Sequence, residues 1–263
     1  MTIPLKSQQD IKKIKAGGEK LSSVLTALVA ATKAGTNVLD IEKKAVQLIK
    51  LKGGVPGFMK VPYYKWATCI NINEGIVHGV PRNYVIKLGD VVSIDIGMYY
   101  QGFHTDMCYT FQVKNPKSSI NSKKNKEAAK FLAAGKLALK EAIKQAKPGN
   151  RVGNISQKIN EVISGAGYNV ALNLTGHGVG KKLHEPPAIP CFLIKPIKET
   201  PLLKPGMVLA IEIIYCQGKP DLIIDQIDGW TIKTKDGKIS AVFEETIALL
   251  SDGSLVLTKL PKN

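Results

Sequence analysis

Carboxylates embedded in apolar, strand-like segments constrain the fold of this chain more than any other feature of its sequence. Asp95 stands between isoleucines in SIDIG, Asp106 lies in HTDMCYTF, and Glu212 interrupts the apolar run VLAIEIIY. Glu244 and Glu245 lie together in AVFEETIALL. A buried carboxylate is costly unless it is paired with a cation. One such residue is usually part of a salt bridge, but acids in four separate segments indicate that the fold brings them together.

A hairpin would place two of these acids side by side. Asp95 and Asp106 flank GMYYQG, a segment that suits a hairpin connection. Adjacent antiparallel strands would direct both carboxylates to one face of a sheet. With Glu212, Glu244 and one imidazole they would form an oxygen-rich set of ligands that can hold two divalent ions. Oxygen ligands alone favour magnesium or calcium, whereas one histidine shifts the expectation to manganese, iron, cobalt or zinc.

The order of secondary structure repeats along the chain, because apolar periodicity predicts two helices, then strands, then the same order again. The expected elements are helices at about 11–28 and 41–51, strands at 67–72, 91–97 and 108–113, an exposed polar connection at 114–127, helices at about 124–146 and 152–165, and strands at 207–214 and 240–249.

An internal similarity accompanies this order. TKAGTNVLDIEKKAVQLIK aligns with AKPGNRVGNISQKINEVIS at a constant offset of 114 residues, so that Gly35 meets Gly149 and Ile49 meets Ile163. Together with the repeated helices, the alignment favours two structurally similar halves, at about 1–113 and 124–263, within a single domain of residues 1–263. A site between such halves would draw its ligands from several strands.

The composition, with 44% apolar residues, is that of an ordinary globular protein. No run approaches the roughly 20 apolar residues of a membrane span, and the N-terminus lacks the apolar region of a signal peptide, so a cytoplasmic protein is expected. The chain has no C-x-x-C pair, no H-E-x-x-H motif and no phosphate-binding loop. Its net charge of +16 favours anionic partners such as nucleic acid or the ribosome, although no nucleic-acid-binding motif is visible.

Two of the four histidines lie close together in a glycine- and proline-rich stretch that suggests a site. His177 and His184 stand seven residues apart in TGHGVGKKLHEPP, which has no regular helical or strand pattern. His78 lies in NEGIVHGVP, where glycine and proline mark the end of a strand. Taken alone, a histidine in that position is more often structural than functional.

A series of motifs in this chain resembles that of the type I methionine aminopeptidases, a family with the pita-bread metallopeptidase fold. The motifs are, in order, NINEGIVHGVP, VSIDIG, GFHTDM, TGHGVGKKLHEPP, LKPGMVLAIE, DGWTIKTKDGKISA and FEETI. The resemblance covers nearly the whole chain. It implies an α+β fold in which a curved antiparallel sheet is covered by two pairs of helices with pseudo-two-fold symmetry.

The resemblance also implies a site with two divalent metal ions of cobalt, manganese, iron or zinc. The residues at the positions of the family's metal ligands are Asp95, Asp106, His177, Glu212 and Glu244. Glu244 is preferred to Glu245 because the family's ligand is the glutamate two places before a threonine, here Thr246.

Catalytic and substrate-binding residues follow from the same motif positions. Glu212 is implied to shuttle a proton as well as to bind metal, His184 to stabilise the oxyanion, and His78 to contact the amide of the second residue. The implied substrate-binding residues are these two histidines together with Cys69, Trp230 and Tyr64. Sulfur and aromatic surfaces suit the thioether of a methionine side chain.

The implied activity is metal-dependent removal of the N-terminal methionine from nascent proteins whose second residue is small. The partner is then a peptide or nascent chain with its initiator methionine, and the basic surface would suit a contact with the ribosome. A cytoplasmic monomer without membrane association is expected.

The chain departs from the family's pattern at a few positions near the ligands. Ile213 stands where proline usually follows the glutamate ligand, Glu245 stands where histidine is usual, and Met107 is larger than the family's residue beside Asp106. None of these changes removes a ligand. They bear on metal preference and substrate range.

Two alternatives compete with the methionine aminopeptidase interpretation. A proline-directed peptidase of the same fold would usually carry a large additional N-terminal domain. A non-catalytic pita-bread protein that binds the ribosome or RNA would suit the basic charge but is expected to lack metal ligands.

Overall fold

The protein contains two pairs of helices beside a large antiparallel sheet, as seen in a computed structural model that describes residues 2–114 and 123–261. Helix α1 packs against α2, and α3 packs against α4. The helices are α1 Gln8–Ala31, α2 Val38–Leu51, α3 Lys123–Gln145 and α4 Val152–Gly165, with short 3-10 helices η1 Phe58–Lys60 and η2 Ile197–Glu199.

Ten strands form the main sheet, and its central path has the order β1-β4-β5-β12-β9-β7-β8, while β2 pairs with β4, β6 with β9 and β13 with β12. A second sheet has the order β10-β11-β3. The strands are β1 Val55–Pro56, β2 Thr68–Ile72, β3 Gly75–Val77, β4 Val91–Tyr100, β5 Phe103–Gln112, β6 Asn169–Val170, β7 Thr175–Gly178, β8 Glu185–Pro190, β9 Val208–Cys216, β10 Leu222–Ile224, β11 Ile232–Thr234, β12 Ser240–Leu250 and β13 Gly253–Val256.

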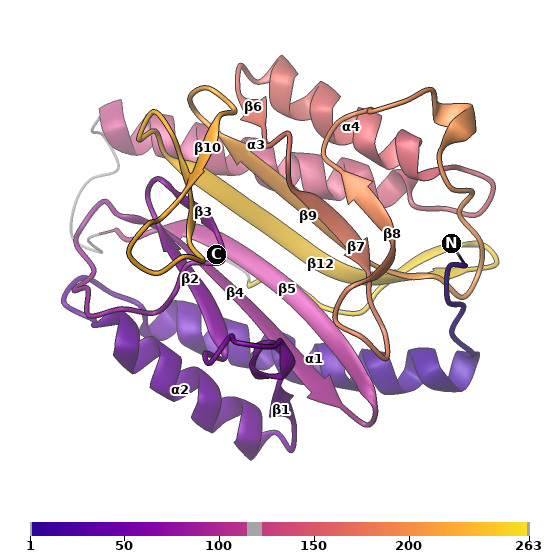
Figure 1. The fold of residues 1–263 in the computed structure, drawn as a ribbon, viewed down its shortest axis with the longest axis horizontal. Coiled ribbons are helices and arrows are strands. Elements are labelled where there is room, and N and C mark those ends of the chain that lie inside the picture. The colour runs from indigo at the N-terminus through magenta and orange to yellow at the C-terminus, as the bar shows by residue number, and fades with distance from the viewer. Residues whose placement is uncertain (1, 115–122, 262–263) are drawn as a thin grey trace.

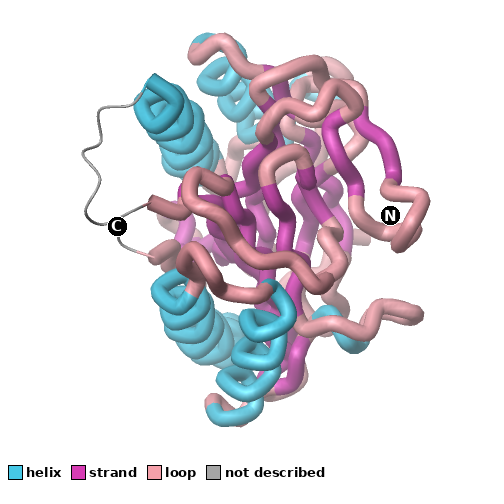
Figure 2. The backbone as a smooth tube through the Cα atoms, turned by 90° about the vertical axis from the view of Figure 1, so that its left-hand side faces the viewer, coloured by secondary structure: helices cyan, strands magenta, loops and turns pink. Residues whose placement is uncertain are grey.

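The helices lie on one side of the main sheet, as Figure 2 shows, with loops on the other side. In Figure 1, β5 and β12 cross the centre of the molecule, with α1 and α2 below them and α3 and α4 above them. One face of the sheet is thus covered by apolar helix surfaces, and the other face is left for a site.

The first two helices begin at residues that satisfy their free backbone N–H groups. Ser7 Oγ accepts a hydrogen bond from the Asp10 N–H at 3.1 Å, and the Asp10 carboxylate accepts one from the Ser7 N–H at 3.1 Å. Asn37 caps α2 by accepting a bond from the Leu39 N–H at 3.0 Å. Such caps each stabilise a helix by about 1 kcal/mol.

Aromatic side chains fill the interface between α3 and the sheet. Phe131, Tyr215 and Phe243 are fully buried, and each contributes about 1.5–3 kcal/mol through removal of apolar surface from water. The Tyr215 hydroxyl donates to the Phe131 carbonyl at 2.6 Å. Gly135 permits this close approach, because a Cβ there would lie 2.5 Å from both Tyr215 Oη and Phe243 Cδ2.

The helices and long strands expected from periodicity are confirmed, as is the α+β class, although β5 begins at Phe103 rather than near 108 and α3 begins at Lys123, within the expected connection 114–127. Residues 115–122 of the expected polar connection lie outside the described residues. The short strands β7 and β8 were not expected, because TGHGVGKKLHEPP lacks strand periodicity. Within it Gly178 pairs with Glu185, and beyond a bulge Thr175 pairs with Pro190. All four cysteines are free and buried. Within the described ranges, no helix is sufficiently long and apolar to cross a bilayer.

Glu42 joins α2 to the start of β2. Its carboxylate is buried and accepts hydrogen bonds from the Ala67 N–H at 2.7 Å, the Thr68 N–H at 3.1 Å and the Thr68 hydroxyl at 2.6 Å. This contact fixes the segment that leads into Cys69.

We predict that Glu42→Gln lowers the free energy of unfolding by about 1–3 kcal/mol, because the amide nitrogen cannot accept the bonds that the lost oxygen accepted. Urea denaturation of wild type and variant measures the change. Lys43→Gln is the matched control, since Lys43 is the next residue of the helix and its side chain is 75% exposed. Equal denaturation midpoints for all three proteins would contradict the prediction.

Candidate active site

Strand pairing brings the acids of four segments to one face of the main sheet. Asp95 of β4 lies opposite Cys108 of β5, Cys108 lies opposite Glu244 of β12, and Glu244 lies opposite Glu212 of β9. Residues directly opposite in antiparallel strands share a face, so these side chains form one row. Asp106 belongs to the same face because it is two residues from Cys108. The expectation that a hairpin directs Asp95 and Asp106 to one face is confirmed.

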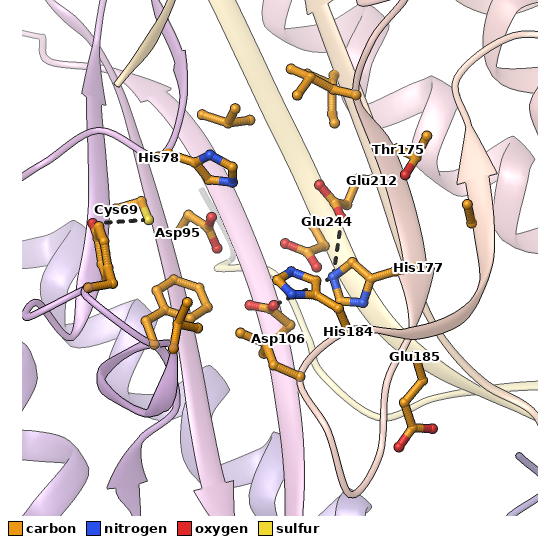
Figure 3. A pocket seen from close by; sticks show the side chains of 18 of the residues that line it. Cys69, His78, Asp95, Asp106, Thr175, His177, His184, Glu185, Glu212 and Glu244 are labelled. Atoms are coloured by element: carbon orange, nitrogen blue, oxygen red, sulfur yellow. Dashed lines mark hydrogen bonds and ion pairs between the residues drawn. The ribbon is translucent and has the colours of Figure 1, made fainter. Parts of the chain in front are cut away.

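His177 adds an imidazole to this row. It lies opposite Ala210, two residues before Glu212, so its side chain joins the carboxylates. Figure 3 shows the side chains of Asp106, His177, Glu212 and Glu244 converging. Potential ligand atoms of Asp106, His177 and Glu244 all lie within 4.8 Å of one another.

All ten residues identified from the sequence line one cavity of about 600 Å³. They are Tyr64, Cys69, His78, Asp95, Asp106, His177, His184, Glu212, Trp230 and Glu244. Candidate ligands and candidate pocket residues that are up to 180 positions apart in the sequence therefore surround a single space. The structure leaves none of the ten outside it.

Thr246 joins the two central strands beside the acids. Its hydroxyl donates to the Asp106 carbonyl at 2.7 Å and accepts from the Asp106 N–H at 3.1 Å. Its own N–H donates to the Thr258 hydroxyl at 2.9 Å. The backbone of Asp106 is thus fixed at the point where β5 and β12 carry carboxylates toward the cavity.

The ring of His177 directs a lone pair at two carboxylates. Nδ1 lies 2.8 Å from the Gly178 carbonyl oxygen, which can only accept, so Nδ1 carries the proton. Burial lowers the pKa of His177 to about 4, and the ring is neutral at neutral pH. Nε2 is then an acceptor, yet it lies 3.5 Å from Glu212 Oε1 and 3.8 Å from Asp106 Oδ2. Acceptors that face one another in this way need either a proton or a cation between them.

The carboxylates lack the partners that would otherwise stabilise their charge. One oxygen each of Asp95, Asp106 and Glu244 is buried without a hydrogen-bond partner in the described part of the chain. Burial raises the pKa of Asp95, Glu212 and Glu244 well above the usual carboxyl range, and neighbouring carboxylates add to the effect. Burial raises the pKa of Asp106 to about 7. The residues present fit a divalent cation, which would satisfy the oxygens and the imidazole together.

The glycines beside His177 provide space for backbone contact. A Cβ at Gly176 would lie 2.6 Å from the Ala210 carbonyl oxygen, and one at Gly178 would lie 2.3 Å from that of Pro186. Strand β7 can therefore lie close to β9 and β8 only with glycine at these positions. The chain then returns through a loop that ends at His184, whose ring centroid lies 4.4 Å from that of His177. The loop between β7 and β8 thus brings the imidazole of His177, at its start, against the imidazole of His184, at its end.

His78 and His184 project into the cavity from loops, as Figure 3 shows. His78 follows β3 directly, and its backbone has a φ of 56°, which is uncommon for a residue with a side chain. His184 precedes β8, where Glu185 forms a buried ion pair with Lys6 at 2.6 Å. Each histidine is therefore held by a fixed backbone while its ring remains exposed to the cavity.

An uncharged pocket adjoins the carboxylates. The Tyr64 hydroxyl donates to the Thr68 carbonyl at 2.9 Å, its oxygen lies 3.2 Å from Cys69 Sγ, and its ring meets the ring of Trp230 edge-on at 5.1 Å. Burial, with a contribution from nearby Asp95, raises the pKa of the Cys69 thiol well above its usual value, so the thiol stays neutral. Sulfur and aromatic carbon thus form one wall.

Two apolar residues of this wall were missed by the sequence analysis. Phe58 and Leu183 are buried in the same cluster as Tyr64 and Cys69 and line the cavity. Leu183 directly precedes His184 in a motif already singled out, which could have indicated it. Phe58 lies in a segment that aligns poorly with the family's motifs, and only its tertiary contacts reveal it.

Comparison with known proteins identifies the family. Residues 12–250 match metallopeptidase family M24. The chain is 39% identical to the methionine aminopeptidase of Aquifex aeolicus, across 99% of this chain and 100% of that protein. Its fold matches methionine aminopeptidase structures from Thermotoga maritima, with a TM-score of 0.90 at 35% identity, and Rickettsia prowazekii, with a TM-score of 0.91 at 25% identity. Each match covers 98% of this chain and 100% of the other.

These matches confirm the pita-bread fold that the motifs implied. The matches cover nearly the full length of each chain, and they combine sequence similarity with a shared fold. The chain belongs to metallopeptidase family M24 and, within it, to the methionine aminopeptidases.

Proposed function

We propose that this methionine aminopeptidase uses two divalent metal ions bound by the five converging side chains. These are Asp95, Asp106, His177, Glu212 and Glu244. The observation that carries the proposal is the convergence of the His177 Nε2 lone pair with oxygens of Glu212, at 3.5 Å, and Asp106, at 3.8 Å. Four carboxylates and one imidazole suit cobalt, manganese, iron or zinc. Bound ions of this kind polarise a carbonyl and acidify a water molecule.

The surrounding residues then position the substrate and move its protons. Glu212 accepts the proton of the attacking water and passes it to the leaving amine. His184 donates a hydrogen bond to the oxygen that becomes negative in the transition state, where a fixed donor is most effective. His78 contacts the amide of the second residue. Both histidines are exposed to the cavity, which is the position that these roles require.

The uncharged wall of Tyr64, Cys69 and Trp230 receives the methionine side chain. Its thioether contacts sulfur and aromatic carbon, and no charged group is needed for recognition. The second residue lies beside His78, where crowding restricts it to small side chains. The substrate is accordingly the N-terminus of a nascent chain that begins with methionine and a small residue.

The wider setting of the activity follows from charge and organisation. The net charge of +16 supports a contact with the ribosome, and we place the protein in the cytoplasm as a monomer. Pseudo-symmetric halves, at about 1–113 and 124–263, would each contribute ligands to the site. The alternatives are less favoured, because all five ligand positions are occupied by suitable residues and the relatives that match along most of the chain are methionine aminopeptidases.

Peptide hydrolysis in defined metals tests the proposed function. We expect turnover of Met-Ala-Ser to be lost in a chelator and restored by cobalt, manganese, iron or zinc. Met-Lys-Ser, Ala-Pro and Leu-Ala should be poor substrates, because the first has a large second residue and the others lack methionine. Full turnover by rigorously metal-free protein would refute the metal-dependent mechanism, and equal rates on Met-Ala-Ser and Met-Lys-Ser would refute the size restriction.

Neighbouring glutamates of β12 provide a matched test of the ligand set. We predict that Glu244→Gln lowers the metal-to-protein ratio measured by elemental analysis, because an amide does not supply the negative charge that a cation attracts. Glu245→Gln should retain wild-type metal content. Glu245 lies opposite Met107 on the other face of the sheet, where its carboxylate accepts a bond from the Leu260 N–H at 3.0 Å. Equal metal loss in both variants would show that the loss is not specific to the cavity.

We predict that His184→Ala keeps its bound metal but loses turnover by about 100- to 1000-fold, the usual effect of removing one transition-state donor. Lys181→Ala, at an exposed position in the same loop, is the control and should retain activity. Turnover of Met-Ala-Ser and metal content are measured on the same preparations. Loss of metal with unchanged activity per bound ion would assign His184 to metal binding instead.

A further inference from the structure

We propose that Asp228 and Thr231 are positioning residues that hold Trp230 and His78 in one fixed relation. The inference rests on the proposed function, in which Trp230 forms the methionine pocket and His78 contacts the substrate amide. Neither Asp228 nor Thr231 lines the cavity. Both therefore act through their neighbours.

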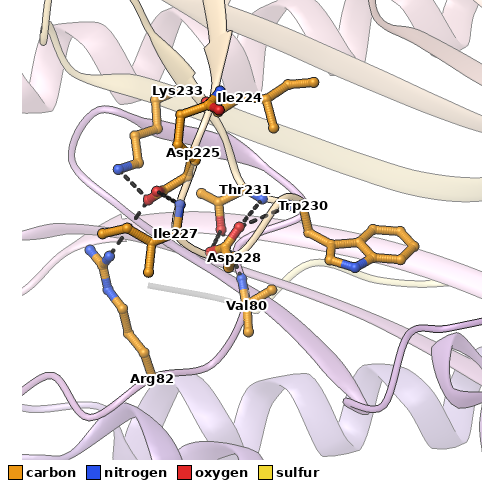
Figure 4. Close-up of polar contacts among 10 residues, drawn as sticks. Val80, Arg82, Ile224, Asp225, Ile227, Asp228, Trp230, Thr231 and Lys233 are labelled. Carbon is orange, nitrogen blue, oxygen red and sulfur yellow. Dashed lines mark hydrogen bonds and ion pairs between the residues drawn. The ribbon is translucent and has the colours of Figure 1, made fainter.

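The carboxylate of Asp228 organises the loop that carries Trp230. Oδ1 accepts hydrogen bonds from the N–H groups of Trp230 and Thr231, both at 2.8 Å, and Oδ2 accepts one from the Thr231 hydroxyl at 2.6 Å (Figure 4). Three donors thus converge on one side chain. The backbone from which the Trp230 ring projects is fixed by this carboxylate.

The Thr231 hydroxyl extends the network to a distant part of the chain. Because it donates its proton to Asp228, its free lone pair is available to the Val80 N–H, which lies 3.1 Å away. Thr231 is only 8% exposed, so water cannot easily replace this bond. A single buried hydroxyl therefore joins segments that are 151 residues apart.

His78 has a backbone conformation that needs such support. Its φ of 56° lies in the left-handed region, which costs free energy for a residue with a side chain and persists only where neighbouring contacts hold it. On one side of His78, Val77 pairs with Ile232 of β11. On the other side, Val80 is held by Thr231. The 231–232 segment thus fixes the backbone both before and after His78.

The segment around Thr231 also positions the uncharged wall of the methionine pocket. The Trp230 ring meets the Tyr64 ring edge-on at 5.1 Å, and Val80 packs in the same apolar cluster as both. Loss of the Thr231 hydroxyl would release the His78 loop from the Trp230 loop. The pocket for the methionine side chain and the histidine that contacts the scissile amide would then no longer be held in a fixed relative position.

Substitutions at Thr231 separate the hydroxyl from the shape of the side chain. Thr231→Val keeps the shape and removes the hydroxyl, and Thr231→Ser keeps the hydroxyl. We expect Thr231→Val to lower kcat/KM for Met-Ala-Ser by about 10- to 100-fold at saturating metal, the size expected for a misplacement of about 1 Å. Thr231→Ser should stay close to wild type, and both variants should keep wild-type metal content.

Asp228→Asn should have an intermediate effect, because its remaining oxygen can still accept from the two N–H groups but its amide nitrogen cannot accept from the Thr231 hydroxyl. Asp225→Asn is the control in the same loop. The Asp225 carboxylate pairs with Lys233, lies 3.9 Å from Arg82 and accepts from the Ile227 N–H at 2.9 Å, so it takes no part in the Asp228 contacts described above (Figure 4). It should keep wild-type kcat/KM while removing these ion pairs.

Tryptophan fluorescence reports the pocket wall without relying on activity. The chain has two tryptophans, so Trp66→Phe leaves Trp230 as the single emitter. In this background, acrylamide should quench Trp230 more efficiently in Thr231→Val than in Thr231→Ser or Asp225→Asn. The measurement also applies to variants with reduced thermal stability, provided that it is made below their melting temperatures.

Equal kcat/KM and equal quenching in Thr231→Val and Thr231→Ser would overturn the inference. An equal loss in Asp225→Asn would overturn it as well, because the effect would then reflect general loosening of the loop. Failure of the wild type to hydrolyse Met-Ala-Ser would instead refute the proposed function, while the quenching comparison would still decide whether the hydroxyl positions Trp230.

Discussion

The burial of four carboxylates and a neutral imidazole on one face of the main sheet is the constraint on which the other features of this structure depend. Such a group opposes folding unless positive charge is supplied, since each buried acid loses its hydration. Among the described residues, no lysine or arginine forms an ion pair with Asp95, Asp106, Glu212 or Glu244. A divalent cation held by these side chains would supply that charge, which is the basis of the proposed metal-dependent chemistry.

Pairing between long strands makes this arrangement precise enough to bind metal. Asp95, Glu244 and Glu212 lie in one cross-strand row, so their spacing follows from the separation of strands in a sheet. Apolar helices cover the opposite face and resist any change of register, because a shift by one residue would turn every carboxylate into the core. The ligands consequently come from a rigid part of the molecule.

Sequence patterns were sufficient for the parts of the fold that depend on local periodicity. The four helices, the long strands and the hairpin between Asp95 and Asp106 follow from apolar spacing and turn residues. The short strands β7 and β8 do not, because backbone contacts at Gly176 and Gly178 determine them. Motif resemblance found the residues that line the cavity, but it could not reveal Phe58, whose place in the pocket is set by tertiary contacts.

In the proposed mechanism, selectivity and hydrolysis depend on different kinds of structure. The carboxylates lie on long paired strands, whereas the pocket wall comes from the loops that carry Tyr64, Leu183 and Trp230. Loops tolerate substitution better than central strands, so the preference for the side chain can change without disturbing the metal site. Such changes must still keep the wall aligned with the reacting bond. The hydroxyl of Thr231 meets this need, because it connects the loop of the pocket to the loop of His78 through contacts that involve no metal ligand.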